Sequence, residues 1–229
     1  MDGRRFYHFT PIVLAACASN AENATQILCW CKQMNFDKWQ HFLRARLFHM
    51  LRKDDAALQE YHLALLAAPG FSRAAECIAF IHASRGEFGI AATQFRNALC
   101  LAPDNAEMYF NLGFVCDKHG DVKEAIEAFQ TATRLKPGFD RAWYGLGICM
   151  AKLGRHAEAA QALHEASTLQ PMNPHAWYAL GMAHHHLHEP DRVKEIILHL
   201  HRFDPLMTHH LIQDTERADL VYLVADLVQ

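Results

Sequence analysis

The sequence has few of the residues that prevent compact folding or mark fibrous proteins. Only 11 of its 229 residues are glycine and 8 are proline, which excludes a disordered or collagen-like chain. The formal net charge of −3 argues against a nucleic-acid partner, because such proteins present a large basic surface. No run reaches the roughly 18 apolar residues that span a bilayer. With 51% apolar residues, the sequence predicts one or two compact units.

The cysteines exclude a disulfide framework. There are seven of them, an odd number, at no spacing typical of a metal site. Cys29 and Cys31 would point about 200° apart on a helix, which suits neither zinc nor a redox pair. A reducing compartment follows, and we expect a cytoplasmic protein.

Signatures of catalysis are also lacking. The sequence contains no glycine-rich phosphate loop, no nucleophile elbow and no metalloprotease helix. We therefore expect no enzymatic activity, no cofactor and no metal.

A repeat with a period of 34 residues is present instead. The segments that begin at Tyr109, Trp143 and Trp177 share the pattern aromatic-x-x-Leu-Gly. A proline follows each of them at the same offset: Pro137, Pro171 and Pro205. A unit of this length cannot bury its apolar face alone, so the sequence predicts a stacked array.

Each unit reads as two helices. In the unit that starts at Ala106, residues at places 4, 7, 8 and 11 share one helical face. Gly120 can adopt the left-handed conformation that ends a helix, and Pro137 stops the second helix because it has no amide proton. The same register predicts five units: 38–71, 72–105, 106–139, 140–173 and 174–207. Arg52 and His188 replace the turn glycine in the first and last units, and atypical end units are expected of an array.

These residues resemble the tetratricopeptide repeat, whose pattern is W-x-x-L-G-x-x-Y followed by A, F, A and P. The resemblance covers residues 38–207. It implies an all-α, right-handed superhelical solenoid of helical hairpins whose first helices line a concave groove. It also implies a non-enzymatic scaffold or chaperone-like adaptor. A bacterial assembly or secretion accessory factor is compatible with this description.

The family's groove positions supply the candidate binding residues. They are aromatic, apolar or basic, with one asparagine that can hold a peptide amide. The set is Arg73, Phe80, Phe110, Asn111, Phe114, Lys118, Arg141, Tyr144, Ile148, Lys152, Tyr178 and Met182. An aromatic floor with a basic rim suits an extended or helical peptide that carries apolar anchors and some acidic residues. Cys77 and Gly145 stand where a clamp for two carboxylates would need polar groups, which argues against that variant.

Four histidines, at positions 184, 185, 186 and 188, support alternative interpretations. His184 and His188 lie four residues apart and share a helical face, which suits a pair of metal ligands. Binding that depends on pH is the milder alternative. His184 also fills the place of the family's tyrosine, so we expect a packing role for it.

The two ends of the chain leave further alternatives open. Residues 1–37 are expected to form a helical extension. Within them, Leu14-Ala15-Ala16-Cys17 resembles a lipobox, so a lipoprotein anchored through Cys17 after cleavage of residues 1–16 is the runner-up, with a role in pilus or outer-membrane assembly. Residues 208–229 are expected to form a capping helix. They are more apolar than one covered face requires, so a homodimer contact or a self-assembling structural subunit is a further alternative.

Overall fold

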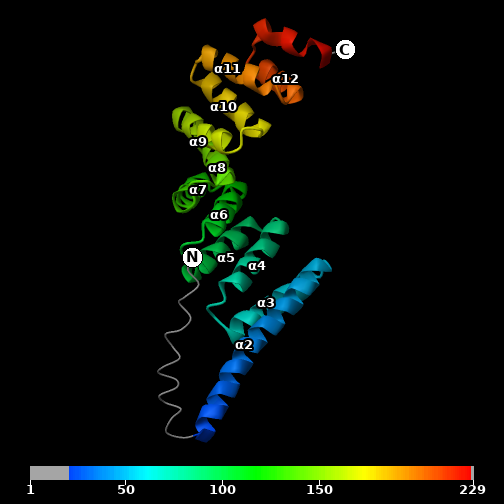
Figure 1. Cartoon of the computed structure of the whole chain (residues 1–229), viewed down its shortest axis with the longest axis vertical. Coiled ribbons are helices and arrows are strands. Elements are labelled where there is room, and N and C mark those ends of the chain that lie inside the picture. The colour runs from blue at the N-terminus through cyan, green and yellow to red at the C-terminus, as the bar shows by residue number, and fades with distance from the viewer. Residues whose placement is uncertain (1–20, 228–229) are drawn as a thin grey trace. The chain divides into compact units, whose positions relative to one another are not determined.

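The computed structural model describes the backbone of residues 21–227 and the side chains of residues 36–225. Cys17 and residues 1–16 lie outside the described residues, so the lipid-anchor hypothesis stays a prediction. The chain divides into two compact units, Met1–Ile81 and His82–Gln229, and the boundary falls near the end of α4 (Ser72–Ser84). Every element in the described range is helical, as the order of helices in Figure 1 shows.

The first unit contains α2 (Ala21–Met50), α3 (Asp54–Ala67) and most of α4. Its core joins Phe42 and Ala45 of α2 to Tyr61 of α3 and Ile78 of α4. Helix α2 runs without a break through residue 37, so the predicted boundary between the extension and the first unit falls inside one helix. That division, like the other unit boundaries, stays a prediction.

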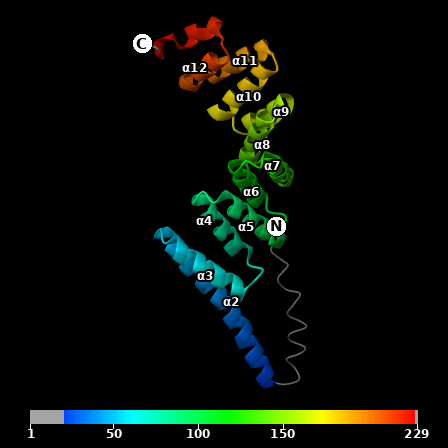
Figure 2. The same cartoon turned by 180° about the vertical axis from the view of Figure 1, so that it is seen from behind.

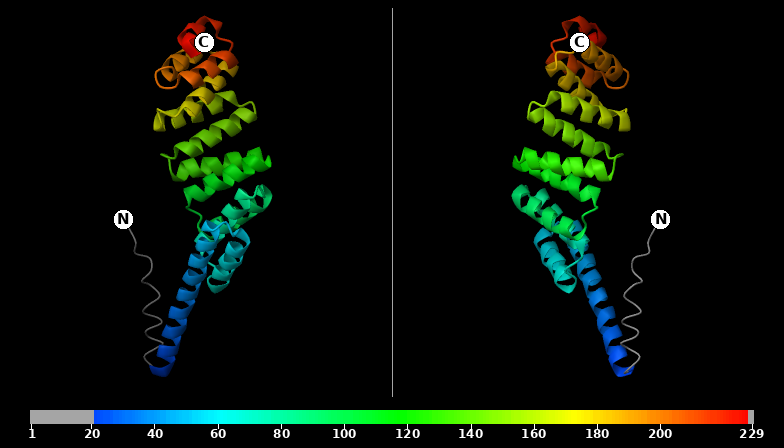
Figure 3. Two further views of the ribbon diagram at one scale, coloured as in Figure 1. Left: turned by 90° about the vertical axis from the view of Figure 1, so that its right-hand side faces the viewer. Right: turned by 90° about the vertical axis from the view of Figure 1, so that its left-hand side faces the viewer.

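The second unit contains three successive helical hairpins. Helix α5 (Phe88–Leu101) comes first. It is followed by α6 (Ala106–His119) with α7 (Val122–Leu135), α8 (Asp140–Lys152) with α9 (His156–Leu169), and α10 (Pro174–His186) with α11 (Pro190–Leu200). Each helix packs on its neighbours in chain order. Figure 2 shows the same order from behind, and Figure 3 shows the green to yellow helices as successive layers.

The turns explain the glycines of the repeat. Gly120 has φ 102° and Gly154 has φ 73°, a conformation that costs other residues energy because of their Cβ. His188 takes the same place with φ 58°, and Arg52 with φ 59°. The two end units therefore keep the turn but carry backbone strain.

Two other repeat positions have a direct physical role. The indole Nε1 of Trp143 donates a hydrogen bond of 2.8 Å to the carbonyl oxygen of Pro137, and Trp177 makes the same bond to Pro171. The aromatic residue of one unit thus fixes the loop that leaves the preceding unit. This explains why tryptophan and proline recur together at a constant offset.

Close helix approach explains the small residues. A Cβ added to Gly113 would lie 2.8 Å from the ring of Phe129, and one added to Gly145 would lie 2.7 Å from the same ring. Phe129 thus fills the space between its own hairpin and the next one. A Cβ on Gly147 would meet Leu163 of its own hairpin at 2.5 Å.

Two short elements complete the chain. Helix α12 (Pro205–Asp214) packs on α10 and α11, and the 3₁₀ segment η1 (Ala218–Leu227) packs on α12. The range predicted as one capping helix therefore contains two elements. Among the described residues, no helix combines the length and the apolar character needed to span a membrane. The predicted all-α solenoid of helical hairpins is confirmed.

Candidate functional site: the surface of the first helices

The first helices of successive hairpins lie beside one another in the second unit. Helix α6 contacts α8, and α8 contacts α10. Ten of the twelve predicted binding residues stand on these three helices, and each of them is exposed or half-buried. We call these ten the first-helix surface: Phe110, Asn111, Phe114, Lys118, Arg141, Tyr144, Ile148, Lys152, Tyr178 and Met182.

The other two predicted residues, Arg73 and Phe80, belong to the first unit. Both stand on α4, where Arg73 is exposed and Phe80 is 45% exposed. They are described apart from the ten residues of the second unit.

An aromatic cluster forms the middle of the first-helix surface. The ring centre of Phe110 lies 5.8 Å from that of Phe129 and 5.1 Å from that of Phe139. Phe139 is the residue directly before α8. Phe114, one turn further along α6, is 46% exposed. Tyr144 of α8 is half-buried, and this burial raises the pKa of its hydroxyl. The surface therefore exposes aromatic rings that are packed on one side against the core.

Two cations lie over these rings. The guanidinium of Arg141 stands 5.2 Å from the centre of the Phe110 ring and 5.4 Å from that of Phe139. The ammonium of Lys118 stands 5.6 Å from the centre of the Phe114 ring. Contacts of this kind are electrostatically favourable. Both side chains remain exposed, so their charges are available to a partner.

Lys152 is in a different situation. Its Nζ lies 2.6 Å and 2.8 Å from the two carboxylate oxygens of Asp117, which stands on the neighbouring α6. The thiol of Cys149 also lies 3.5 Å from Asp117. The ion pair neutralises part of the basic rim expected from the sequence. Lys118 and Arg141 are the residues of this surface whose cations lie over aromatic rings.

The C-terminal end of the surface is partly occupied by the chain itself. The hydroxyl of Tyr178 donates a hydrogen bond of 2.5 Å to Asp214 of α12. This bond, with some burial, raises the pKa of Tyr178 to about 12. Tyr178 is therefore bound to the cap, and the accessible centre lies on α6 and α8.

Sequence reasoning missed two participants at this surface. Phe139 is 3% exposed and supports both Phe110 and Arg141. A signal in the sequence was Phe71, which stands 68 residues, or two periods, before Phe139. In the structure the Phe71 ring also lies beside a cation, since the ammonium of Lys38 stands 5.6 Å from its centre. Asp214 lies outside the predicted units, and nothing in the sequence links it to Tyr178.

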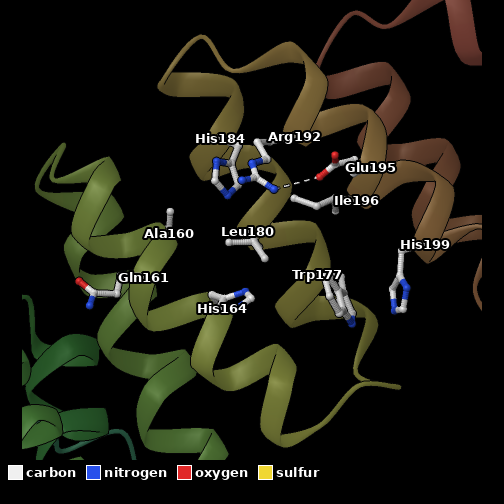
Figure 4. A pocket seen from close by; sticks show the side chains of 10 residues that line it. All are labelled: Ala160, Gln161, His164, Trp177, Leu180, His184, Arg192, Glu195, Ile196 and His199. Atoms are coloured by element: carbon white, nitrogen blue, oxygen red, sulfur yellow. Dashed lines mark hydrogen bonds and ion pairs between the residues drawn. The ribbon is translucent and has the colours of Figure 1, made fainter.

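A hollow of about 510 Å³ opens elsewhere, between α9, α10 and α11 (Figure 4). On α10 its lining residues face about 150° away from Tyr178 and Met182, as the helical period requires. Trp177 and His199 form one wall, with ring centres 4.2 Å apart. His164, Leu180, His184 and Glu195 also line the hollow. The sequence predicts no hollow at this place, because three helices build it jointly.

The histidine cluster has structural contacts. His184 Nδ1 lies 2.6 Å from a carboxylate oxygen of Glu189, and the ring of His186 stacks on that of His156 at 4.5 Å. Among the residues that the structure describes, no group of three or more His, Cys, Asp or Glu side chains is arranged to hold a metal ion. His184 thus contacts the start of its own second helix, which agrees with a packing role.

Comparison with known proteins gives the fold family. Two tetratricopeptide-repeat models match residues 81–138 and 118–182. No relative was found among curated proteins. Solved structures are similar in fold, and all three of those described below are less than 25% identical to this chain.

One is YrrB, a tetratricopeptide-repeat protein with an unusual peptide-binding site. It has a TM-score of 0.69 and 20% identity over 90% of this chain and 97% of its own. MamA has a TM-score of 0.68 and 18% identity over 80% and 96%. PilF of Pseudomonas aeruginosa has 0.65 and 16% over 85% and 90%. The two family models and the tandem hairpins identify residues 81–182 of the chain as tetratricopeptide repeats, and the solved structures show that its fold is that of tetratricopeptide-repeat solenoids.

Proposed function

We propose that this protein is a non-enzymatic scaffold or chaperone-like adaptor that binds a segment of another protein on the first-helix surface. One observation carries the proposal. Phe114 is 46% exposed one turn along α6 from the half-buried Phe110, and Lys118 and Arg141 place cations over these two rings. The half-buried Tyr144 stands on the neighbouring helix α8. An aromatic surface bordered by charge is typical of binding hot spots.

The chemistry of the surface defines the partner class. The partly exposed rings of Phe110 and Phe114 favour apolar side chains of the partner as anchors. The cations of Lys118 and Arg141 favour carboxylates beside those anchors. The partner is thus an extended or helical segment with apolar anchors and some acidic residues. The similarity to YrrB, described as having a peptide-binding site, supports a peptide-like ligand.

A cytoplasmic assembly or secretion accessory factor is the role we favour, and an envelope lipoprotein anchored through Cys17 is the runner-up. Intact-mass measurement of natively expressed protein separates the two. Loss of residues 1–16 with added lipid mass supports the anchored form. A retained Met1 region supports the cytoplasmic one.

The binding proposal is tested in two stages. Affinity purification with cross-linking mass spectrometry identifies the partner, and calorimetry then measures its affinity for the wild type and single variants. We expect Phe114→Ala and Tyr144→Ala each to weaken binding by about tenfold or more, as hot-spot truncations do. Leu135→Ala, at a residue 38% exposed on α7, is the matched control and should leave affinity unchanged. Equal affinity of all four proteins would refute the proposal.

A further inference from the structure

The interior junctions of the array follow one rule. The third and tenth residues of each first helix share a face, about 150° around the helix from the eighth residue that packs on its own hairpin. In the second unit this face is covered by the preceding second helix, since α5 packs on α6, α7 on α8 and α9 on α10. The residues concerned are 0–2% exposed: Met108, Val115, Ala142, Cys149, Ala176 and Ala183.

Among the described residues, no helix covers this face of the first hairpin. Helix α2 begins before the repeat register, but the equivalent places of the first unit, 38–71, are those of Gln40 and Leu47. Both are exposed, Leu47 by 54%. Phe36 and Leu43 on the same side of α2, and Leu51 in the turn that ends it, are 66%, 60% and 56% exposed. We call this surface the head face: Phe36, Gln40, Leu43, Leu47 and Leu51. The interior junctions show that a helix normally packs on this side.

At the other end of the described chain, η1 is the last element and exposes apolar side chains on its outer side. Segment η1 packs on α12 through its inner side, where Leu220 and Val224 are 2% exposed. Val221 and Tyr222 are 45% and 68% exposed. Asp219 is exposed as well, and its carboxylate accepts two hydrogen bonds of 2.8 Å from the guanidinium of Arg217. We call these three residues the tail face: Asp219, Val221 and Tyr222.

The charges of the two ends are complementary. Residues 36–53 contain five basic residues and one acidic residue, Asp37. Residues 205–227 contain four acidic residues and one basic residue, Arg217. Two head faces would bring Arg44 and its neighbours toward their own copies, which is unfavourable. A head face and a tail face bring opposite charges together.

We propose that the tail face of one copy packs on the head face of a second copy, so that the array continues from one chain into the next. Such a contact joins different surfaces, is not closed by a two-fold axis, and allows linear assembly. It uses neither Phe114 nor Tyr144. Self-association and partner binding on the first-helix surface are therefore separable.

Sedimentation velocity of the full chain over a range of concentrations tests the proposal. The wild type should associate progressively as concentration rises, and less strongly at high salt because the charges are screened. Leu47→Glu and Tyr222→Glu should each lower the association constant at least tenfold. Leu66→Glu, at a residue 78% exposed on α3, and Tyr144→Ala are the controls and should associate like the wild type. Equal melting temperatures show that each variant is folded, and Leu43→Glu and Val221→Glu replace any variant that is not.

A mixture of the two variants gives the sharpest outcome. Leu47→Glu retains its tail face and Tyr222→Glu retains its head face, so an equimolar mixture should form dimers and nothing larger. A wild type that stays monomeric at every concentration would overturn the proposal. So would association that is lost in only one of the two variants, since that result indicates a contact between identical faces. Association that survives both substitutions would overturn it as well.

Discussion

The ammonium of Lys152 lies 2.6 Å from the carboxylate of Asp117, and this pair joins α8 to α6 across 35 residues of sequence. The Lys152 side chain is 46% exposed and that of Asp117 is 16% exposed. Asp117 thus forms an ion pair with Lys152, whereas the sequence predicts that Lys152 binds a partner.

Removing that carboxylate should strengthen the binding of an acidic partner. Asp117→Asn leaves Lys152 free, and because exposed ion pairs contribute about 0–1 kcal/mol, we expect a gain in affinity of about twofold to fivefold. Calorimetry with the identified partner measures it. Glu158→Gln, which removes the carboxylate partner of Arg155 on α9, is the control and should have no effect. Weaker binding by Asp117→Asn would show that Asp117 itself contacts the partner.

The packing of Phe129 against Gly145 predicts a specific loss of stability. A methyl group at Gly145 would lie 2.7 Å from the ring, and overpacking costs about 1–3 kcal/mol. Alanine also favours a helix by about 0.5–1 kcal/mol over glycine, so Gly145→Ala should lower the free energy of unfolding by about 1–2 kcal/mol. Urea denaturation measures this.

Gly138→Ala serves as the reference for that measurement, because nothing lies within 4 Å of its added methyl group. It should be close to neutral. A Gly145→Ala variant as stable as Gly138→Ala would mean that the two hairpins approach less closely than described.

At His188, in contrast, substitution by glycine should increase stability. Its φ of 58° is strained for a residue with a Cβ, by about 1–2 kcal/mol, and glycine recovers part of this. We expect His188→Gly to raise the free energy of unfolding by about 0.5–1 kcal/mol. Gly154→Ala, at φ 73° with no atom near the added methyl group, should lower it by a similar amount. Thermal denaturation of both variants checks the pair, and a destabilised His188→Gly protein would contradict the account.

The hydrogen bond between Tyr178 and Asp214 should make the stability of the C-terminal cap depend on pH in the alkaline range. Its pKa is raised from 10.0 to about 12, first by the hydrogen bond to Asp214. A raised folded pKa stabilises the fold fully below pH 10, and this contribution is lost as pH rises toward 12. Burial also raises the pKa of Tyr61 and of Tyr144, so several tyrosines should titrate late. Ultraviolet titration of phenolate formation should therefore lose one late-titrating tyrosine in Tyr178→Phe, while the other late ones remain. In Asp214→Asn that tyrosine should titrate earlier, and an unchanged titration there would rule out the hydrogen bond as the cause.

Repetition made the backbone predictable. The Trp143–Pro137 and Trp177–Pro171 hydrogen bonds recur because the same residues return every period, so the sequence shows the hairpins and their turns. Contacts that occur once are different. The Tyr178–Asp214 bond depends on a cap outside the repeat, and Phe139 supports the surface from a loop position that the repeat pattern leaves unspecified.

The charge of the surface was also beyond sequence reasoning. Lys118 and Lys152 occupy equivalent places, yet one lies over Phe114 and the other pairs with Asp117. Equivalent register does not determine which neighbour a long side chain reaches. The continuation of α2 through residue 37 is a further example, because the sequence carries no stop signal there and the repeat register alone predicts a boundary.

Site-specific photo-crosslinking tests the central claim most directly. A benzophenone side chain is placed either at Phe114, 46% exposed on the first-helix surface, or at Leu169, 40% exposed on α9. We predict that the partner is captured from position 114 and not from position 169. Capture from position 169 alone, or equally from both positions, would contradict the assignment of the first-helix surface as the binding site.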